Sequence, residues 1–412
     1  MATNFSDLLN KQSNTSQEAA TSNIPANEKL TAAEFIELVR AVRDNSAIVD
    51  VLKNPNKIIY TSTNGRAIEL NYKNVFGANI ISNTYENGRG VILFDGPVTT
   101  IGEYAFDSSE VKSIIIPDSV TSIGDFAFSY SSLADIYIPN SVKSIGRYVF
   151  SATYNLENIT IPGSVASISE GLFEYSGVKN VTLLEGVTSI GTSAFSSCEN
   201  LISISLPNSL TSIGSNAFQY SGSLKSISIP DSVTTIGPNA FDFCSSLSSA
   251  KLPQYLTVIN KGLFDGCNLI NILLPEHITE IGENAFYACD KMESIIIPER
   301  VTNIGRSVFY NAENLKTVYL KPTAPPTIGE TMFHGMSDYT LYVPYESVEA
   351  YKTADGWSQC ADRIRGYHYD ASVAANFIDM LMAGLGTQDV ALLANRIIAA
   401  INIADPADIK PE

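Results

Sequence analysis

The stretch Ile229-Pro-Asp-Ser-Val-Thr-Thr-Ile-Gly-Pro-Asn-Ala-Phe241 decides the fold, because nearly the same residues stand at Ile116–Phe128. In both copies an isoleucine precedes a glycine, and a phenylalanine follows that isoleucine by five residues. The pair recurs every 22 to 24 residues, about eleven times between Val91 and Asp338. A fixed period of this length indicates a repeat protein. The isoleucines are Ile101, Ile123, Ile145, Ile168, Ile190, Ile213, Ile236, Ile259, Ile281, Ile304 and Ile328, and the phenylalanines are Phe106, Phe128, Phe150, Phe173, Phe195, Phe218, Phe241, Phe264, Phe286, Phe309 and Phe333.

Each repeat begins with a short strand and a turn. Segments such as Ser113–Ile116 and Ser226–Ile229 alternate polar and apolar residues, which is typical of a strand with one buried face. A proline follows most of these strands and ends them, because it cannot donate a ladder hydrogen bond. No single turn can bury its isoleucine and phenylalanine alone, but stacked turns can. The sequence therefore predicts a solenoid with a parallel β-sheet on one face and short turns and irregular coil on the other.

This motif resembles the BspA-like leucine-rich-repeat family, the Treponema pallidum type, over about residues 57–366. Besides the repeat, Tyr342–Tyr345, Ala350–Lys352 and Gly356-Trp357 match the family's C-terminal segment. The resemblance implies a leucine-rich-repeat solenoid that works by binding, since family members are mostly surface or secreted adhesion modules. It does not name the ligand.

Five regions are expected along the chain. They are a flexible arm with an amphipathic helix at 1–56, an N-terminal cap at 57–95, the solenoid at 96–338, a C-terminal cap at 339–366 and a helical hairpin tail at 367–412. A capping box at Thr31 and Glu34 starts the first helix, and its apolar stripe is a candidate attachment or oligomerisation surface. The stripe consists of Phe35, Leu38, Val39 and Val42. Packing of that stripe against its own domain or against a copy of itself is the plainer alternative.

The C-terminal tail is expected to form two helices, Ala371–Leu385 and Val390–Ile403, around Gly386. Such a hairpin cannot stand alone in water, so it either docks on a partner or folds back on the solenoid end. Protein partners are expected through the N-terminal arm and helix and through this hairpin, with a homo-oligomer as the expected state.

Composition excludes several classes of partner. Only 17% of residues are charged, yet the net charge is -17, and an acidic chain repels nucleic acid and anionic membranes. Nothing approaches 18 consecutive apolar residues, so no membrane span is expected. The first residues contain no basic region followed by an apolar run, so no secretory signal is expected.

Catalytic chemistry is missing from the sequence. His277, His334 and His368 have no partners at the spacing of a triad or a metal site, and paired carboxylates recur nowhere in register. No enzyme activity, cofactor or metal is expected. Four cysteines share the position three residues after the phenylalanine, where other turns carry Ser, Ala or Met, so they are interpreted as buried structural thiols. They are Cys198, Cys244, Cys267 and Cys289.

Two surfaces are candidate ligand faces. The first is the outward column of the strands, where apolar or charged residues interrupt a run of Ser and Thr, since exposed apolar side chains on a sheet often mark a contact. These residues are Ile115, Tyr137, Lys251, Leu273, Ile296 and Tyr319. The second is a row of tyrosines two residues after the phenylalanine, Tyr130, Tyr175 and Tyr220. A solvated sheet with no ligand explains most of the Ser and Thr positions.

The segment Lys29–Arg40 resembles N-terminal segments of virion fibre-type proteins in phages of Bacteroidetes. With no secretory signal in the sequence, this resemblance favours a virion-associated fibre or decoration protein that displays the solenoid to a host surface protein or glycan. The alternative is an extracellular or cell-surface adhesin of a bacterium or protist.

Overall fold

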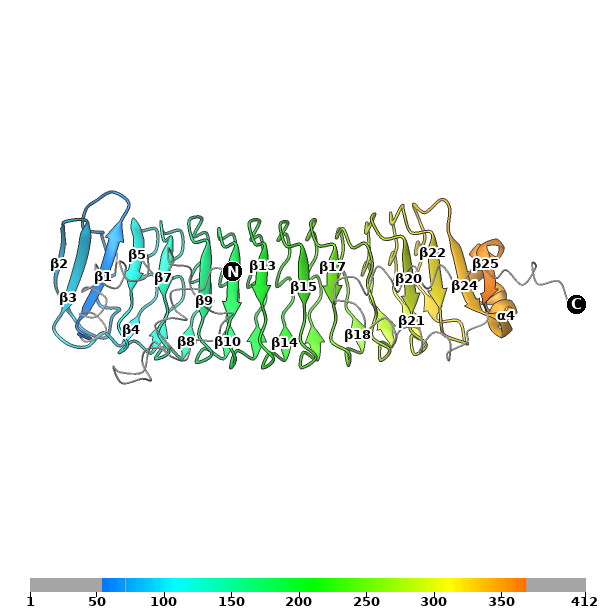
Figure 1. The fold of residues 1–412 in the computed structure, drawn as a ribbon, viewed down its shortest axis with the longest axis horizontal. Coiled ribbons are helices and arrows are strands. Elements are labelled where there is room, and N and C mark those ends of the chain that lie inside the picture. The colour runs from blue at the N-terminus through cyan, green and yellow to red at the C-terminus, as the bar shows by residue number, and fades with distance from the viewer. Residues whose placement is uncertain (1–53, 71, 368–412) are drawn as a thin grey trace, which may run out of the picture. The chain divides into compact units, whose positions relative to one another are not determined.

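The structure, a computed structural model, describes residues 54–70 and 72–367 (Figure 1). Two compact units divide the chain, Met1–Val165 (unit 1) and Ala166–Glu412 (unit 2). The predicted flexible arm, the helix with Phe35, Leu38, Val39 and Val42, and the two helices of the C-terminal tail lie outside the described residues.

Unit 1 begins with an antiparallel sheet that continues into the repeat. Strands β1 (Lys57–Ser62), β2 (Ile80–Glu86) and β3 (Arg89–Phe94) pair antiparallel, and β1 also pairs antiparallel with β5 (Val111–Ile115). From there β5 pairs in parallel with β7 (Asp135–Tyr137). Strand β1 therefore covers the edge of β5 that would otherwise present unpaired backbone groups.

The isoleucines of unit 1 form a second, parallel sheet. Its strands are β4 (Thr100–Ile101), β6 (Ser122–Ile123) and β8 (Ser144–Ile145), and isoleucine pairs with isoleucine across each ladder. Strand β9 (Asn158–Ile161) begins the last turn of the unit. The phenylalanine rings stack in the same register, with centroids 5.2 Å apart from Phe106 to Phe128 and 5.8 Å apart from Phe128 to Phe150.

Unit 2 repeats the same two-strand turn (Figure 1). The first strands of its turns are β11 (Asn180–Leu183), β13 (Ser203–Ser205), β15 (Ser226–Ser228), β17 (Ser249–Lys251), β20 (Ser294–Ile297) and β22 (Thr317–Leu320). The second strands are β10 (Ser167–Ile168), β12 (Ser189–Ile190), β14 (Ser212–Ile213), β16 (Thr235–Ile236), β18 (Val258–Ile259), β19 (Glu280–Ile281), β21 (Asn303–Ile304) and β23 (Thr327–Ile328). All of the pairings described among these strands are parallel, which confirms the predicted parallel β-solenoid.

The C-terminal part of unit 2 departs from the repeat. Strand β24 (Thr340–Pro344) joins β22, and β25 (Ile364–Tyr367) joins β24. Between them lie the 3-10 helix η1 (Tyr345–Ser347), the short helix α4 (Val348–Thr353) and the 3-10 helix η2 (Trp357–Arg363). The Tyr351 hydroxyl donates to the Pro322 carbonyl and the Trp357 indole N–H to the Pro326 carbonyl, both at 2.8 Å. Both rings are fully buried, so they cover the last turn with their polar atoms satisfied.

The predicted core is confirmed in ten of the eleven turns. From Ile101 to Ile304 and from Phe106 to Phe309, every member of the two rows is at most 3% exposed. Only Ile328 and Phe333, in the last turn, are half-buried. Burial of this kind is worth about 1.5–3 kcal/mol for each large apolar side chain, so the two rows carry much of the folding free energy.

The glycine after the isoleucine is fixed by the turn before it. A Cβ on Gly214 would lie 2.7 Å from the backbone of Gly191 and Thr192, and one on Gly237 would lie 2.4 Å from the Ser215 nitrogen. Neither glycine has a positive φ, so the requirement is space between turns and not backbone freedom. Two turns replace this glycine, with Ser169 and Asn260, and both place a glycine two residues later.

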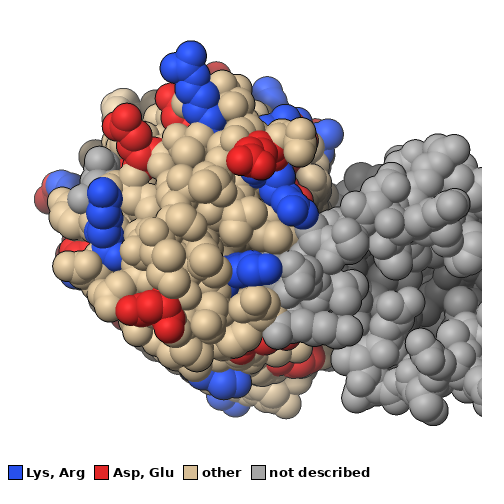
Figure 2. Space-filling model, turned by 90° about the vertical axis from the view of Figure 1, so that its left-hand side faces the viewer, with Lys and Arg blue, Asp and Glu red and all other residues tan. Residues whose placement is uncertain are grey.

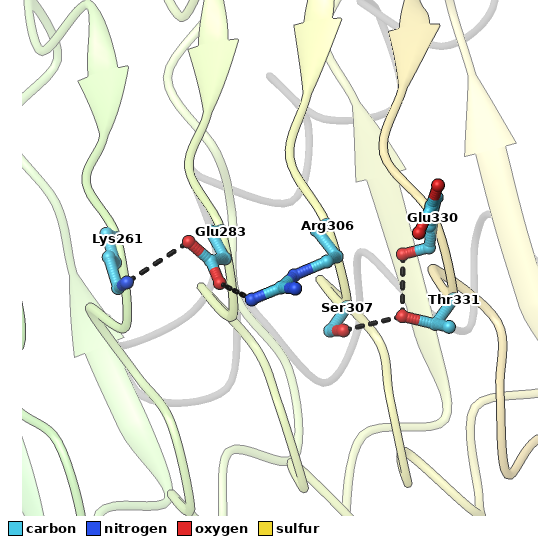
Figure 3. A network of polar contacts seen from close by, with 6 residues as sticks. All are labelled: Lys261, Glu283, Arg306, Ser307, Glu330 and Thr331. Atoms are coloured by element: carbon cyan, nitrogen blue, oxygen red, sulfur yellow. Dashed lines mark hydrogen bonds and ion pairs between the residues drawn. The ribbon is translucent and has the colours of Figure 1, made fainter.

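Charged side chains on neighbouring turns of the solenoid form ion pairs with one another (Figure 3). In unit 2 Glu283 accepts from Lys261 at 3.1 Å on one side and from Arg306 on the other, and these contacts hold the pKa of the Glu283 carboxyl below its ordinary value. In unit 1 Arg147 binds Asp125 through two nitrogens, each at 3.1 Å. The basic partners are more than half exposed, so each pair adds at most about 1 kcal/mol.

We predict that Gly237→Ala destabilises the chain by about 1–3 kcal/mol, because its methyl group has to displace backbone of the preceding turn. The matched control is Gly222→Ala, in the same unit, where the nearest atom to a new Cβ is the Ser245 hydroxyl at 3.3 Å. That variant should change stability by less than about 0.5 kcal/mol. Urea unfolding followed by circular dichroism measures both, and equal effects of the two variants would contradict the packing argument.

Candidate binding surfaces

The outward column of the strands is only partly exposed. Leu273 is 73% exposed and Lys251 is also exposed, whereas Ile115, Tyr137 and Ile296 are half-buried. The predicted strand at Leu273 does not form, since residues 271–274 have no strand assignment, yet Ile272 and Leu274 stay buried there. Leu273 is therefore the one strongly exposed aliphatic residue among the six predicted for this column.

Tyr319 was expected on the exposed surface, and that expectation is wrong. Only 9% of it is exposed. Its ring stacks on Tyr342 of β24 with centroids 5.1 Å apart, and Tyr367 of β25 meets it edge-on at 6.2 Å. The sequence pattern places Tyr319 on an outward face, but the two C-terminal strands bring rings beside it that the repeat does not predict.

Every turn bends through two left-handed residues that flank its phenylalanine. They stand two residues before and two residues after the ring, for example Tyr104 and Ser108 around Phe106 and Asn239 and Phe243 around Phe241. Glycine and asparagine tolerate this conformation best, and other L residues pay about 1–2 kcal/mol. Glycine or asparagine occupies several of these positions, as Gly262 and Asn216 do, but aromatic residues occupy seven others.

The predicted tyrosine row consists of three of these left-handed residues. Tyr130 of unit 1 has φ 54°, and Tyr175 and Tyr220 of unit 2 each have φ 60°. They are 64%, 55% and 48% exposed. Tyr220 stacks on Phe243, with centroids 5.4 Å apart, whereas Tyr130 and Tyr175 make no ring contact with the described part of the chain. Phe243, which is 47% exposed, continues the row and was missed because only tyrosines were considered.

A second aromatic row, in unit 1, was also missed. Tyr104, Phe126 and Tyr148 are left-handed residues two positions before the phenylalanine, and their rings stack with centroids 5.0 and 5.1 Å apart. Their period of 22 residues is visible in the sequence, so the signal was available. Because each ring covers the face of the next, this row presents ring edges to solvent.

The cysteine interpretation is confirmed. Cys198, Cys244, Cys267 and Cys289 are completely buried and form no disulfide. Each thiol donates to the carbonyl of the phenylalanine of the preceding turn, as Cys244 does to Phe218 at 3.1 Å and Cys198 to Phe173 at 3.0 Å. Ser221 makes the same contact with Phe195. Burial raises the pKa of the Cys198 thiol to about 12, which makes it a poor nucleophile.

Two carboxyl groups of unit 2 lie on neighbouring turns, with Asp242 buried and Asp265 half-buried. Asp242 and Asp265 each follow their phenylalanine directly, and in each the Oδ1 atom is buried without a hydrogen-bond partner in the described part of the chain. Asp242 accepts from the Gln219 amide at 2.6 Å through its other oxygen. Burial raises the pKa of the Asp265 carboxyl to about 7, and repulsion from Asp242 adds to the shift. Two such groups destabilise the fold when both are charged.

We predict that stability falls as pH rises from about 4 to about 7, because the folded chain keeps a proton on Asp265 that the unfolded chain has already lost. Below that window both states are protonated, and above it both are ionised, so the effect levels off at each end. Asp265→Asn should flatten the profile and raise stability at pH 7. The urea midpoint against pH measures this, and an unchanged slope in the variant would contradict the assignment to Asp265.

The histidines of the described residues form no catalytic or metal-binding cluster. His277 meets Tyr255 edge-on and His334 stacks on Tyr310, while His368 lies outside the described range. Within residues 54–70 and 72–367, no cluster of three or more His, Cys, Asp or Glu side chains could hold a metal ion. The same residues include no helix that could span a membrane. The end of unit 1 beside β2 is largely uncharged, with single acidic and basic side chains scattered over it (Figure 2).

Comparison with known proteins points to one family. The description "BspA type Leucine rich repeat region (6 copies)" matches residues 99–225 and 211–340. Comparison with curated proteins finds no match.

Several solved structures are similar. A leucine-rich repeat protein from Bacteroides ovatus has 26% sequence identity and a TM-score of 0.51, over 66% of this chain and 76% of that one. The pneumococcal vaccine antigen PcpA has 21% identity and a TM-score of 0.46, over 66% and 72%. A leucine-rich repeat protein of T. pallidum has 20% identity and a TM-score of 0.30, over 63% and 92%.

Proposed function

The chain belongs to the BspA-type leucine-rich-repeat family, and from that premise we propose that it is a non-enzymatic adhesion protein whose solenoid surface binds a host surface protein or glycan. The observation that carries the proposal is the presence of exposed tyrosines at left-handed positions in each unit, Tyr130 in unit 1 and Tyr175 in unit 2.

The energetics of these two tyrosines favour a binding role. Their left-handed backbone costs about 1–2 kcal/mol relative to an ordinary conformation. More than half of each side chain is exposed, so burial returns little of that cost, and neither ring has an aromatic partner in the described residues. Every turn has this backbone, so the informative feature is the choice of an exposed tyrosine there, and tyrosine offers a large contact area for little loss of entropy.

We predict that Tyr130→Asn stabilises the chain by about 0.5–1 kcal/mol, because asparagine tolerates the left-handed backbone better. The same variant should lower adhesion at least several-fold. The matched control is Tyr154→Asn, also in unit 1, where the tyrosine is 66% exposed but its φ is not positive. It should gain no stability and keep its adhesion.

Thermal unfolding and binding of the full chain to a panel of immobilised cell-surface proteins and glycans measure the two effects. If Tyr130→Asn gained stability and every interaction on the panel kept its strength, the aromatic row would be a structural feature and not a ligand face.

We further propose that the chain is displayed on a virion, held by protein contacts of residues 1–56, with the C-terminal tail as a second contact and a homo-oligomer as the assembled state. The resemblance of Lys29–Arg40 to phage fibre segments supports this placement. A bacterial cell-surface adhesin is the rival, supported by the bacterial source of the similar leucine-rich-repeat protein.

Deleting residues 1–56 should remove the protein from purified particles while residues 57–412 still give a folded, soluble chain by circular dichroism. Unchanged incorporation would contradict attachment through this segment. The neighbouring genes separate the two placements, because capsid and portal genes accompany a virion protein and export genes accompany a cellular adhesin.

A further inference from the structure

The strand ladder of unit 2 is interrupted between β13 and β15. Strand β13 (Ser203–Ser205) pairs with β11, and β15 (Ser226–Ser228) pairs with β17, but β13 and β15 belong to different sheets. Other successive turns of the unit continue the ladder, as β20, β22 and β24 do, although it also stops after β17, where residues 271–274 form no strand. The interruption leaves backbone groups of two facing strands without ladder partners.

Core side chains reach the surface at this interruption. Ile204 in β13 and Leu206 directly after it occupy the two inward positions of this turn, and both are half-buried. The equivalent residues of the next turn, Ile227 and Ile229, are 4% and 0% exposed. Loss of the ladder alone does not cause this exposure, because Ile272 and Leu274 stay buried where residues 271–274 form no strand. The exposed aliphatic pair is specific to one turn.

A groove of about 550 Å³ lies over this pair, with Pro230 extending its apolar wall. The volume is within the range of small-molecule sites, roughly 300–1,000 Å³. A protein partner would need about 800 Å² on each side for a stable interface, which a groove of this size does not supply by itself. The groove therefore fits a ligand of one or a few rings, or a short part of a larger one.

The polar wall of the groove has hydrogen-bonding capacity to spare. Ser205, Ser228 and Lys251 line it, and their side chains make no hydrogen bond or ion pair within the described part of the chain. Other serines nearby are already engaged, since Ser232 donates to the Leu210 carbonyl at 2.6 Å and Ser209 to the Val187 carbonyl at 2.7 Å. The uncommitted groups are thus those of the outward column, two hydroxyls and one ammonium.

We propose that this groove binds a neutral saccharide, an inference that rests on the proposed adhesive function and names its ligand class. A sugar ring presents hydroxyls at its edge and C–H groups on its face. The free serine hydroxyls and Lys251 can hydrogen-bond to the hydroxyls at the edge of the sugar, and Ile204 and Leu206 can pack against the C–H groups of its face. Lys251 and Asp231 give the lining one charge of each sign, and the chain's net charge of -17 disfavours an acidic sugar at long range.

The test uses the full chain on an array of immobilised neutral and acidic oligosaccharides, followed by titration with the best neutral binder. Ser228→Trp fills the groove and should weaken that binding about tenfold or more, equivalent to a loss of at least one good polar contact. Ser294→Trp is the matched control. It makes the same change at an outward position of β20 in the same unit, outside the groove lining, and should leave affinity within about twofold.

A second variant reads the charge of the ligand. Lys251→Glu should change the affinity for a neutral sugar only several-fold, and that affinity should depend little on salt concentration. An acidic sugar would instead lose most of its affinity both on Lys251→Glu and on addition of salt. Circular dichroism confirms that each variant is folded, and Ser205→Tyr replaces Ser228→Trp if the latter does not fold.

Four results would overturn the assignment. Neutral-sugar binding that survives Ser228→Trp would place the site elsewhere and leave the adhesive function standing. Binding to acidic sugars alone, abolished by Lys251→Glu, would refute the ligand class. Binding to cell-surface proteins but to no glycan on the array would refute the saccharide proposal and keep adhesion, whereas binding to neither would refute the adhesive function as well.

Discussion

In both units a turn rests on the backbone of the turn before it at a distance that leaves no room for a Cβ. The glycine that follows the repeated isoleucine in nine of the eleven turns marks this contact: at Gly124, Gly237 and Gly305 a methyl group would lie within 2.6 Å of a backbone nitrogen. This close approach fixes the spacing between successive turns. That spacing brings isoleucine opposite isoleucine in the ladders. It also sets the phenylalanine rings about 5 to 6 Å apart, the separation at which aromatic pairs gain most. The core side chains are buried because successive turns lie this close.

The same closeness explains why the turns are strained. To return within 22 to 24 residues the chain bends through left-handed residues on both sides of each phenylalanine. In unit 1 stacking offsets part of that cost, since the pairs Tyr104–Phe126 and Phe126–Tyr148 each gain about 0.5–1.5 kcal/mol. The exposed Tyr130 and Tyr175 have no such offset. The two kinds of aromatic position therefore differ in energy although they have the same backbone, and only the second kind needs an explanation outside the fold.

Features that depend on one turn could be predicted from the sequence, and features that depend on how turns meet could not. The buried isoleucines, phenylalanines and cysteines follow from period and residue type alone. The burial of Tyr319 depends on β24 and β25, which follow no repeat, and the half-burial of Ile204 occurs in one turn although the repeat pattern there is unchanged. Likewise, Asp242 and Asp265 look like ordinary polar loop residues in the sequence, whereas in the structure burial, and then repulsion from Asp242 on the neighbouring turn, raises the pKa of Asp265.

This division locates the places where function can reside. A residue in the core of the solenoid, such as Phe218 or Cys244, contacts the turns on both sides. Substituting it therefore lowers the stability of all of these turns. A residue on the surface of the solenoid can vary without affecting the core. A surface residue that lowers the stability of the fold is therefore informative about function. Tyr175, strained and exposed, and Leu206, an inward aliphatic residue left half-buried, are both choices that the fold alone would not favour. Since a solenoid offers many equivalent turns, the turns that break the pattern are the ones able to distinguish one ligand from another.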